Sequence, residues 1–177
     1  MNESWAQSGG YTRRHCVNQV RVITPAANWA LPRRTVTHST GGHLGRARIL
    51  LADDHPDLLK TVERQLEPEF EVVGKVLDGQ LLLEEALRLK PDVIVSDISM
   101  PLPNGIDAAD QLKESGCQSR IVFLTVHSDP DFVRVCLAAG ALGYVVKSRM
   151  ATELVPAIRE ALAGHIFISD HLAGRYN

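Results

Sequence analysis

The sequence predicts a doubly wound α/β fold, a five-stranded parallel sheet with five helices. From residue 47 onward, short β-type apolar runs alternate with helix-length amphipathic segments, which is the pattern of βαβ crossovers. Four of these runs end directly in polar residues, which are Asp53 with Asp54, Asp97, Thr125 and Lys147. Because the carboxyl ends of parallel strands border one crevice, we expect these five side chains to line one pocket.

The first half of the repeat runs to the central strand. A strand is predicted over residues 47–52, and Pro56 opens a helix, since proline suits the first helical position. A second strand follows over residues 70–76, then a second helix, and then the central strand over residues 93–96. The apolar stripes of the two helices are predicted to be Leu58, Leu59, Val62 and Leu66 in the first and Leu82, Leu83, Ala86 and Leu87 in the second.

The second half begins with a loop over residues 99–105, which two prolines and a glycine interrupt. Strands are predicted over residues 121–124 and 142–146, and Gly140 closes the helix between them. The last helix contains Pro156, which we expect near its start, where backbone N–H groups lack partners anyway. The stripes of these three helices are Ile106, Ala109 and Leu112, then Phe132, Val133, Cys136 and Leu137, then Leu154, Ile158, Ala161 and Leu162.

Charge divides the 177 residues into unlike parts. Residues 1–45 hold five Arg and one acid, a net +4, whereas the remainder holds 14 Lys and Arg against 20 acids, a net −6. The first part lacks a sustained apolar period, so we expect a largely disordered basic extension. We expect a globular domain over residues 46–164 and a C-terminal tail over residues 165–177.

Composition also excludes several classes of protein. No apolar run approaches the length of a membrane span and no signal peptide is recognisable, so a cytoplasmic protein is expected. The three cysteines lack the spacing of a disulfide framework or a zinc site. The net −6 of the domain disfavours direct DNA binding, because DNA affinity depends largely on neutralising phosphates.

The three acids at the strand ends indicate a cation site. Two like charges about 4 Å apart repel by about 4 kcal/mol at an effective dielectric near 20, so Asp53, Asp54 and Asp97 would need a hard cation such as Mg²⁺. Taken singly, each residue has a plainer interpretation: an acid near a helix start, a turn residue, a capping hydroxyl (Thr125) or a solvated lysine (Lys147). Their occurrence together, with a carboxylate able to act as nucleophile, favours formation of an aspartyl phosphate.

The motifs that contain these residues resemble the receiver domains of bacterial response regulators, of the type found in the LuxR/NarL class. The matching segments are ILLADDHP, PDVIVSDISMP with NGIDA, IVFLTVHSDPDFV and AAGALGYVVKS. The resemblance covers residues 47–164 and implies a CheY-like, flavodoxin-like fold. It implies that Asp97 is the phosphoacceptor, Asp54 a direct Mg²⁺ ligand, Asp53 an acid bound to the ion mainly through water, and the Ser99 carbonyl a further ligand.

The resemblance also assigns the switch residues. Thr125 matches the switch hydroxyl of the family and Lys147 matches its characteristic lysine. Tyr144 matches the aromatic residue whose rotamer reports phosphorylation. By the same resemblance, Ser99 and His127 flank the line of water attack and would tune dephosphorylation. The implied partners are a sensor histidine kinase or acetyl phosphate as phosphodonor, and an output protein or second copy at the surface of the fourth helix, fifth strand and fifth helix. The domain would be a phosphoacceptor that promotes its own phosphorylation and slow dephosphorylation, not an enzyme.

Several alternatives remain open from the sequence. The chain stops after HIFISDHLAGRYN, a tail resembling the linker to a helix-turn-helix domain, so we expect either a stand-alone receiver or a shortened LuxR-type regulator. An Asp-nucleophile phosphohydrolase would need an acid two residues after Asp97, where Ser99 stands. A receiver used only for docking predicts a lost acceptor or metal acid, and none is lost. A nucleotide-binding domain would need a glycine-rich loop after the first strand.

Overall fold

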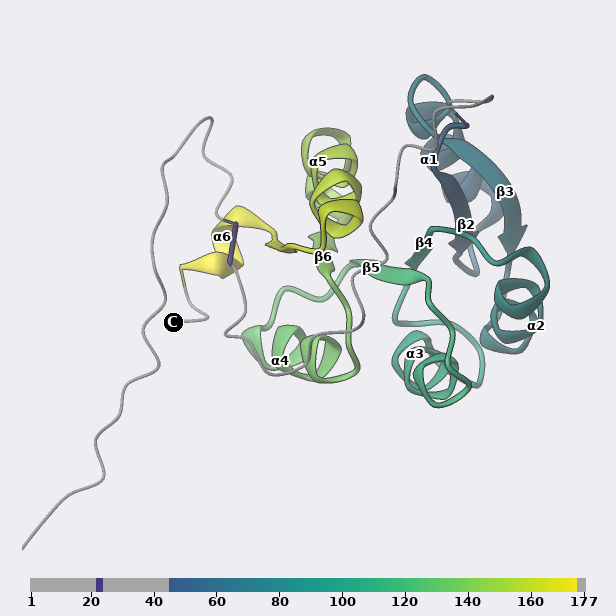
Figure 1. Cartoon of the computed structure of the whole chain (residues 1–177). Helices are drawn as coiled ribbons and strands as arrows, with labels where there is room; N and C mark the ends of the chain where they lie inside the picture. The colour runs from purple at the N-terminus through teal and green to yellow at the C-terminus, as the bar shows by residue number, and fades with distance from the viewer. Residues whose placement is uncertain (1–21, 24–44, 175–177) are drawn as a thin grey trace, which may run out of the picture.

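A computed structural model describes residues 22–23 and 45–174 of the chain, which form one twisted sheet with helices on both faces (Figure 1). The strand order is β1-β7-β6-β5-β4-β2-β3, and every pairing is parallel except that of β1 with β7. The strands are β1 (Val22–Ile23), β2 (Arg48–Ala52), β3 (Glu71–Val76), β4 (Val93–Ser96), β5 (Arg120–Thr125), β6 (Gly143–Val146) and β7 (Ile166–Ile168). The predicted fold class, a doubly wound α/β fold of the CheY-like type, is confirmed.

The helices lie where the apolar stripes predict them. They are α1 (Pro56–Leu66), α2 (Gly79–Leu89), α3 (Gly105–Glu114), α4 (Pro130–Ala138), α5 (Met150–Ala163) and the short α6 (Asp170–Ala173), with one 3₁₀ turn at Lys147–Arg149. Pro56 is the first residue of α1, as expected. Gly140 follows α4 with a φ of 97°, a left-handed conformation that glycine adopts without strain.

Two apolar clusters form the core, one on each face of the sheet. The helices α1 and α5 cover one face and α2, α3 and α4 cover the other (Figure 1). Along β2, Ile49 and Leu51 pack in the first cluster, whereas Leu50 and Ala52 pack in the second. The central strands are therefore apolar on both faces, which is why they appear in the sequence as continuous apolar runs rather than alternating ones.

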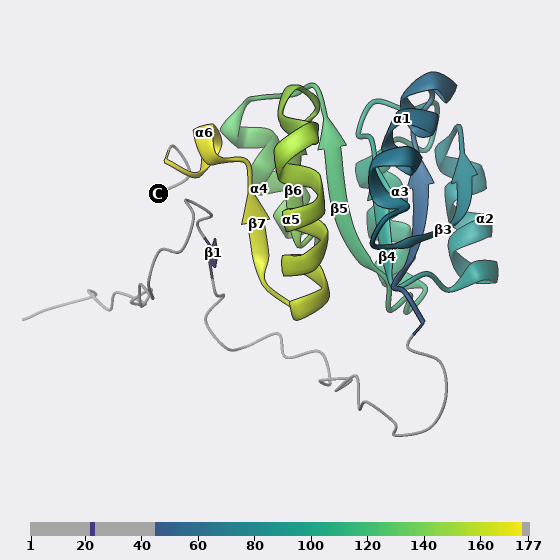
Figure 2. The same ribbon diagram turned by 90° about the horizontal axis from the view of Figure 1, so that it is seen from above.

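The count of five strands and five helices was too low. Residues 166–168 add a strand parallel to β6, and Val22–Ile23 pairs antiparallel with that strand at its outer edge (Figure 2). Phe167, Ile168 and Leu172 are each at most 2 % exposed. The ordered core therefore continues past Gly164, because the segment that resembles a linker contains apolar residues that the sheet edge and α5 can bury.

The expectation for Pro156 was also wrong. The helix α5 begins at Met150, so Pro156 lies inside it rather than near its start. An internal proline removes one backbone hydrogen bond and normally costs several kcal/mol. The burial of Leu154, Ala157 and Ile158 on the inner face of α5 offsets this cost.

Other expectations concern parts of the chain at the margins of the structure. The predicted disorder of residues 1–45 falls outside the described residues, except for Val22–Ile23 and Gly45. Cys16 is likewise outside them, and Cys117 and Cys136 are free thiols. Among the described residues, no helix is both long enough and apolar enough to cross a membrane.

Candidate functional site

The crevice lies where the chain order of the sheet reverses. Strand β2 has β3 on one side and β4 on the other, so the loops after β2 and β4 leave toward opposite faces and open a gap at the carboxyl ends. The backbone pairing continues one residue beyond each strand: the Asp53 N–H donates to the Val76 carbonyl at 3.1 Å, and the Asp97 N–H donates to the Ala52 carbonyl at 2.8 Å. This pairing fixes both aspartates at the edge of the crevice.

The Lys147 ammonium connects these two carboxylates. Its Nζ lies 2.7 Å from Asp53 Oδ2 and 2.7 Å from Asp97 Oδ2. All three side chains are largely buried, with 15 % of Lys147, 5 % of Asp53 and 3 % of Asp97 exposed. Burial lowers the pKa of Lys147, but hydrogen bonds and charge attraction from both aspartates outweigh it, so its pKa lies above the ordinary value. Lys147 is therefore held as a cation between two acids from neighbouring strands.

The Asp97 carboxylate is aimed by its own loop. Its Oδ1 accepts a hydrogen bond from the Ile98 N–H at 2.7 Å, which leaves Oδ2 for Lys147. Gly105, the first residue of α3, packs directly on this loop, since a Cβ there would lie 2.0 Å from the Asp97 carbonyl oxygen. Only glycine allows so close an approach. The sequence marked Gly105 as a loop breaker but gave no sign of this contact.

Asp54 and His55 complete an acidic group at the mouth of the crevice. The His55 Nδ1 lies 2.6 Å from Asp54 Oδ1 and 3.1 Å from Asp53 Oδ1. Among the described residues, these three could hold a metal ion, since their ligand atoms all lie within 4.8 Å of one another. Sequence reasoning overlooked His55, although its position directly after the two acids was a visible signal.

The three acids fit a divalent cation by charge. Asp53, Asp54 and Asp97 carry −3, and Lys147 contributes +1, which leaves −2 at the crevice. Carboxylate oxygens are the ligands that Mg²⁺ prefers. The Asp97 carboxylate does not belong to the compact group of Asp53, Asp54 and His55, and its link to Asp53 runs through the shared ammonium.

The predicted switch residues Thr125 and Tyr144 both form hydrogen bonds with the backbone of His127. Thr125, at the end of β5, is fully buried, and its Oγ1 accepts a hydrogen bond from the His127 N–H at 3.3 Å. Tyr144 is also fully buried, and its hydroxyl donates to the His127 carbonyl at 3.0 Å. Burial, and then the nearby Cys136, raises the pKa of Tyr144, so this hydroxyl keeps its proton.

The predicted tuning residues form a bridge beside the crevice. The Ser99 hydroxyl and His127 Nε2 are 2.9 Å apart and share a hydrogen bond. Phe132 stacks on the His127 ring, with centroids 4.1 Å apart and planes inclined by 10°. Phe132 was predicted only as part of the stripe of α4. The structure thus joins the loops after β4 and β5 through one side-chain contact.

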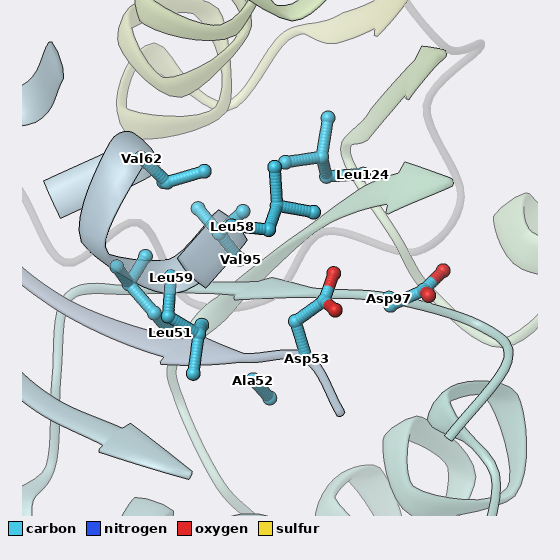
Figure 3. Close-up of a pocket in the computed structure, with 9 residues that line it drawn as sticks. All are labelled: Leu51, Ala52, Asp53, Leu58, Leu59, Val62, Val95, Asp97 and Leu124. Atoms are coloured by element: carbon cyan, nitrogen blue, oxygen red, sulfur yellow. The ribbon is translucent and has the colours of Figure 1, made fainter. Parts of the chain in front are cut away.

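A hollow beneath the carboxylates is lined by apolar side chains. Figure 3 shows Asp53 and Asp97 beside each other, with the apolar side chains of α1, β2, β4 and β5 mostly to the left of and above them. The apolar members are Leu51, Ala52, Leu58, Leu59, Val62, Val95 and Leu124. This lining lowers the local dielectric, which strengthens the ionic contacts of Lys147.

Comparison with known proteins agrees with this geometry. Residues 49–159 match the family described as the response regulator receiver domain. The chain is 38 % identical over 129 residues to the nitrate/nitrite response regulator protein NarL of Escherichia coli K12, covering 71 % of this chain and 59 % of that protein. It is 34 % identical over 127 residues to the transcriptional regulatory protein YvfU of Bacillus subtilis, covering 71 % and 64 %. The chain thus spans about three fifths of the length of these relatives.

Solved structures of response regulators also superpose on this chain. A two-component response regulator of the LuxR family from Aurantimonas sp. SI85-9A1 superposes with a TM-score of 0.70 at 33 % identity, covering 75 % of this chain and 96 % of that one. The isolated receiver domain of RcsB from Salmonella enterica serovar Typhimurium, in the presence of the phosphomimetic BeF₃⁻, gives 0.67 at 26 % identity, covering 73 % and 97 %. The chain belongs to the response regulator receiver domain family, the phosphoacceptor modules of two-component signalling, with relatives in the NarL/LuxR class.

Proposed function

We propose that this chain is a phosphoacceptor response regulator in which Asp97 receives the phosphoryl group. The observation that carries the proposal is the position of the Lys147 ammonium, 2.7 Å from both the Asp97 and the Asp53 carboxylates in a largely buried crevice. A fixed cation next to a carboxylate nucleophile suits a reaction that brings further negative charge to that carboxylate.

In the proposed reaction an Asp97 oxygen attacks phosphorus. A P–O bond forms while the bond to the donor breaks, either the P–N bond of a kinase phosphohistidine or the P–O bond of acetyl phosphate. The electron pair of the broken bond leaves with the donor. Lys147 stays protonated throughout, because its pKa is raised, and donates a hydrogen bond to the transferred group.

Mg²⁺ is the cofactor that the proposal requires. Asp53 and Asp54 would hold it with Asp97 and the Ser99 carbonyl, and when bound it would neutralise charge on the phosphoryl oxygens. The net −2 left by three carboxylates and Lys147 supports a divalent rather than a monovalent ion.

The switch would act through Thr125 and Tyr144. Hydrogen bonds from Thr125 and Lys147 to the phosphoryl group, at about 1.5–3 kcal/mol each, total about 3–6 kcal/mol. Inverting a 1:99 equilibrium takes about 5.5 kcal/mol. Tyr144 is already buried, with its hydroxyl on the His127 carbonyl, so a shift of Thr125 would be felt by Tyr144 through the backbone of His127.

Ser99 and His127 would set the lifetime of the phosphoryl group. In dephosphorylation a water attacks phosphorus, the bond to Asp97 breaks and inorganic phosphate leaves. Opening the Ser99–His127 bridge would let the His127 ring orient that water. The proposed tuning is tested by comparing the decay of the phosphorylated protein with that of the Ser99→Ala and His127→Ala variants; unchanged decay in both would refute it.

The proposed partners follow from this chemistry. A sensor histidine kinase would supply the phosphoryl group in the cytoplasm, with acetyl phosphate as a small alternative donor. The output partner, or a second copy, would bind the surface of α4, β6 and α5. Because β7 pairs with the outer edge of β6 and all four residues of β6 are buried, the exposed part of that surface would be formed by β7 and α6 together with α4 and α5.

Intact-mass analysis after incubation with acetyl phosphate and Mg²⁺ tests the proposal. We expect one phosphoryl adduct, absent from Asp97→Asn and absent when Mg²⁺ is chelated. An adduct that persists in Asp97→Asn would refute the assignment of the acceptor. Failure of the wild type with acetyl phosphate and with candidate kinases would favour a docking module. Catalytic turnover of a phosphomonoester would instead identify a phosphohydrolase and contradict a non-enzymatic role.

A further inference from the structure

A buried serine ties the C-terminal segment to the strand that carries Lys147. Ser169 directly follows β7 and is fully buried. Its Oγ accepts a hydrogen bond from the Val146 N–H at 3.0 Å and donates one to the Glu153 carboxylate of α5. Its own N–H donates to the Tyr144 carbonyl at 2.9 Å. One residue therefore contacts β6 at two points and α5 at a third.

The bond to Val146 replaces a missing rung of the sheet. The register of β6 with β7 runs from Gly143 opposite Phe167 to Tyr144 opposite Ile168 and continues no further. Val146, the last residue of β6, is buried, so its N–H needs a partner inside the protein. The Ser169 hydroxyl is that partner.

The bond to Glu153 fixes the hydroxyl itself. Glu153 is only 8 % exposed, and a buried carboxylate requires donors. Ser169 is one donor to this carboxylate. The Nε of Arg149, in the turn that begins with Lys147, lies 4.0 Å from Glu153 Oε1. With its proton committed to Glu153, the Ser169 hydroxyl presents a lone pair to the Val146 N–H.

We propose that Ser169 is a positioning residue for Lys147, acting through the backbone of Val146. The inference rests on the proposed function. Lys147 follows Val146 directly, and its Nζ must meet carboxylates from two other strands at 2.7 Å each. Since a charged group must be placed within about 0.5 Å to act in catalysis, anchoring the preceding amide restricts where the ammonium can lie.

Replacement of the serine hydroxyl tests the inference. Ser169→Ala removes both side-chain hydrogen bonds, and Ser169→Cys nearly preserves the shape with only a weak donor and acceptor, which provides a second variant if alanine impairs folding. Glu153→Gln keeps an acceptor for the serine. Ser119→Ala is the matched control, because Ser119 donates to the Pro91 carbonyl at 2.6 Å, next to the opposite ends of the strands.

Two measurements on each full-length variant separate positioning from general damage. Hydrogen exchange of the peptide containing Val146 reports the anchoring bond directly, and we expect faster exchange in the Ala and Cys variants only. At saturating Mg²⁺ we expect phosphorylation by acetyl phosphate to slow about three- to tenfold, the loss expected for one hydrogen bond. The Mg²⁺ concentration at half-maximal rate should change by a smaller factor than the rate, because the backbone hydrogen bonds that hold Asp53 and Asp97 do not involve Ser169.

The outcomes distinguish the two levels of proposal. A wild type that forms no adduct with acetyl phosphate or with candidate kinases contradicts the proposed function. A wild type that forms the adduct, with Ser169 variants at the wild-type rate, refutes only the role of Ser169. Equal slowing in Ser119→Ala would also overturn positioning, because it would indicate general damage to the fold. So would a higher half-maximal Mg²⁺ concentration with an unchanged saturating rate, because bound Mg²⁺ draws unfolded chain into the folded state.

Discussion

Replacing Lys147 by methionine should destabilise the folded chain strongly in the absence of Mg²⁺. The side chain is 15 % exposed and its two partners 5 % and 3 %, so the variant leaves two carboxylates buried without their cation. Removing one partner from a buried ion pair costs about 3–5 kcal/mol. Methionine matches the lysine stem in length, so little of this loss comes from packing.

Urea unfolding at pH 7.5 in EDTA, followed by far-ultraviolet circular dichroism, measures the difference. Lys60→Met is the matched control, because Lys60 pairs with Asp57 at 3.0 Å on the surface, where the side chains are 72 % and 96 % exposed. We expect Lys60→Met to lower the free energy of unfolding by less than about 1 kcal/mol. The double variant Lys147→Met with Asp97→Asn should recover part of the loss, since only one buried carboxylate then remains.

The pH dependence of the difference has a definite sign. The pKa of Lys147 is raised in the folded chain by Asp53 and Asp97, against the effect of burial. Its contribution to stability is therefore complete below the unfolded pKa of about 10.4 and is lost as the pH rises through the folded pKa. On the alkaline side, the gap between wild type and Lys147→Met should narrow in that pH range. A gap below about 1 kcal/mol at pH 7.5 in EDTA would refute the reasoning.

Three further predictions concern other parts of the fold. Burial raises the pKa of the Cys136 thiol to about 12, so the free energy of unfolding should fall as the pH rises above the ordinary thiol pKa and through 12. In urea unfolding, Cys136→Ala should lessen this loss. An equal pH dependence in wild type and variant would contradict the prediction. Gly105→Ala places a Cβ 2.0 Å from the Asp97 carbonyl oxygen. Phosphorylation measured by intact mass should therefore slow at least tenfold, which corresponds to about 1.4 kcal/mol of activation free energy. An unchanged rate would show that the loop can move aside without affecting Asp97. Removing residues 165–177 should lower the free energy of unfolding by several kcal/mol, because the deletion removes the buried contacts of Phe167, Ile168 and Leu172. A loss below about 1 kcal/mol would show that the tail is only loosely attached.

The sequence predicted the central fold well because local and global signals agree there. Asp53, Asp97 and Thr125 stand at or directly after the ends of apolar runs that are buried on both faces, and the short length of these runs favours buried strands. The resemblance to receiver domains added roles that spacing alone could not assign, such as that of Tyr144. The structure then places the Lys147 ammonium in direct contact with both Asp53 and Asp97.

The remainder depends on contacts between segments far apart in the chain. The strand β7 has only three residues, too few for periodicity to distinguish from a linker. Its stability comes from pairing with β6, and no local sequence pattern predicts that pairing. The same holds for Ser169, which in sequence is an ordinary polar residue and in the fold is the partner of a backbone amide 23 residues away.

Strand β6 connects the site to the tail. It carries Tyr144 and Val146, pairs with β5 on the side of Thr125, and pairs with β7 on the other side. A displacement of β6 toward a phosphorylated Asp97 would therefore act on Thr125 through one neighbour and on Ser169 through the other. Because Ser169 holds β6 by two hydrogen bonds, β6 cannot move alone: either β7 moves with it or those bonds break. On this argument the change at the surface would include the C-terminal segment, and hydrogen exchange in residues 166–173 should respond to phosphorylation.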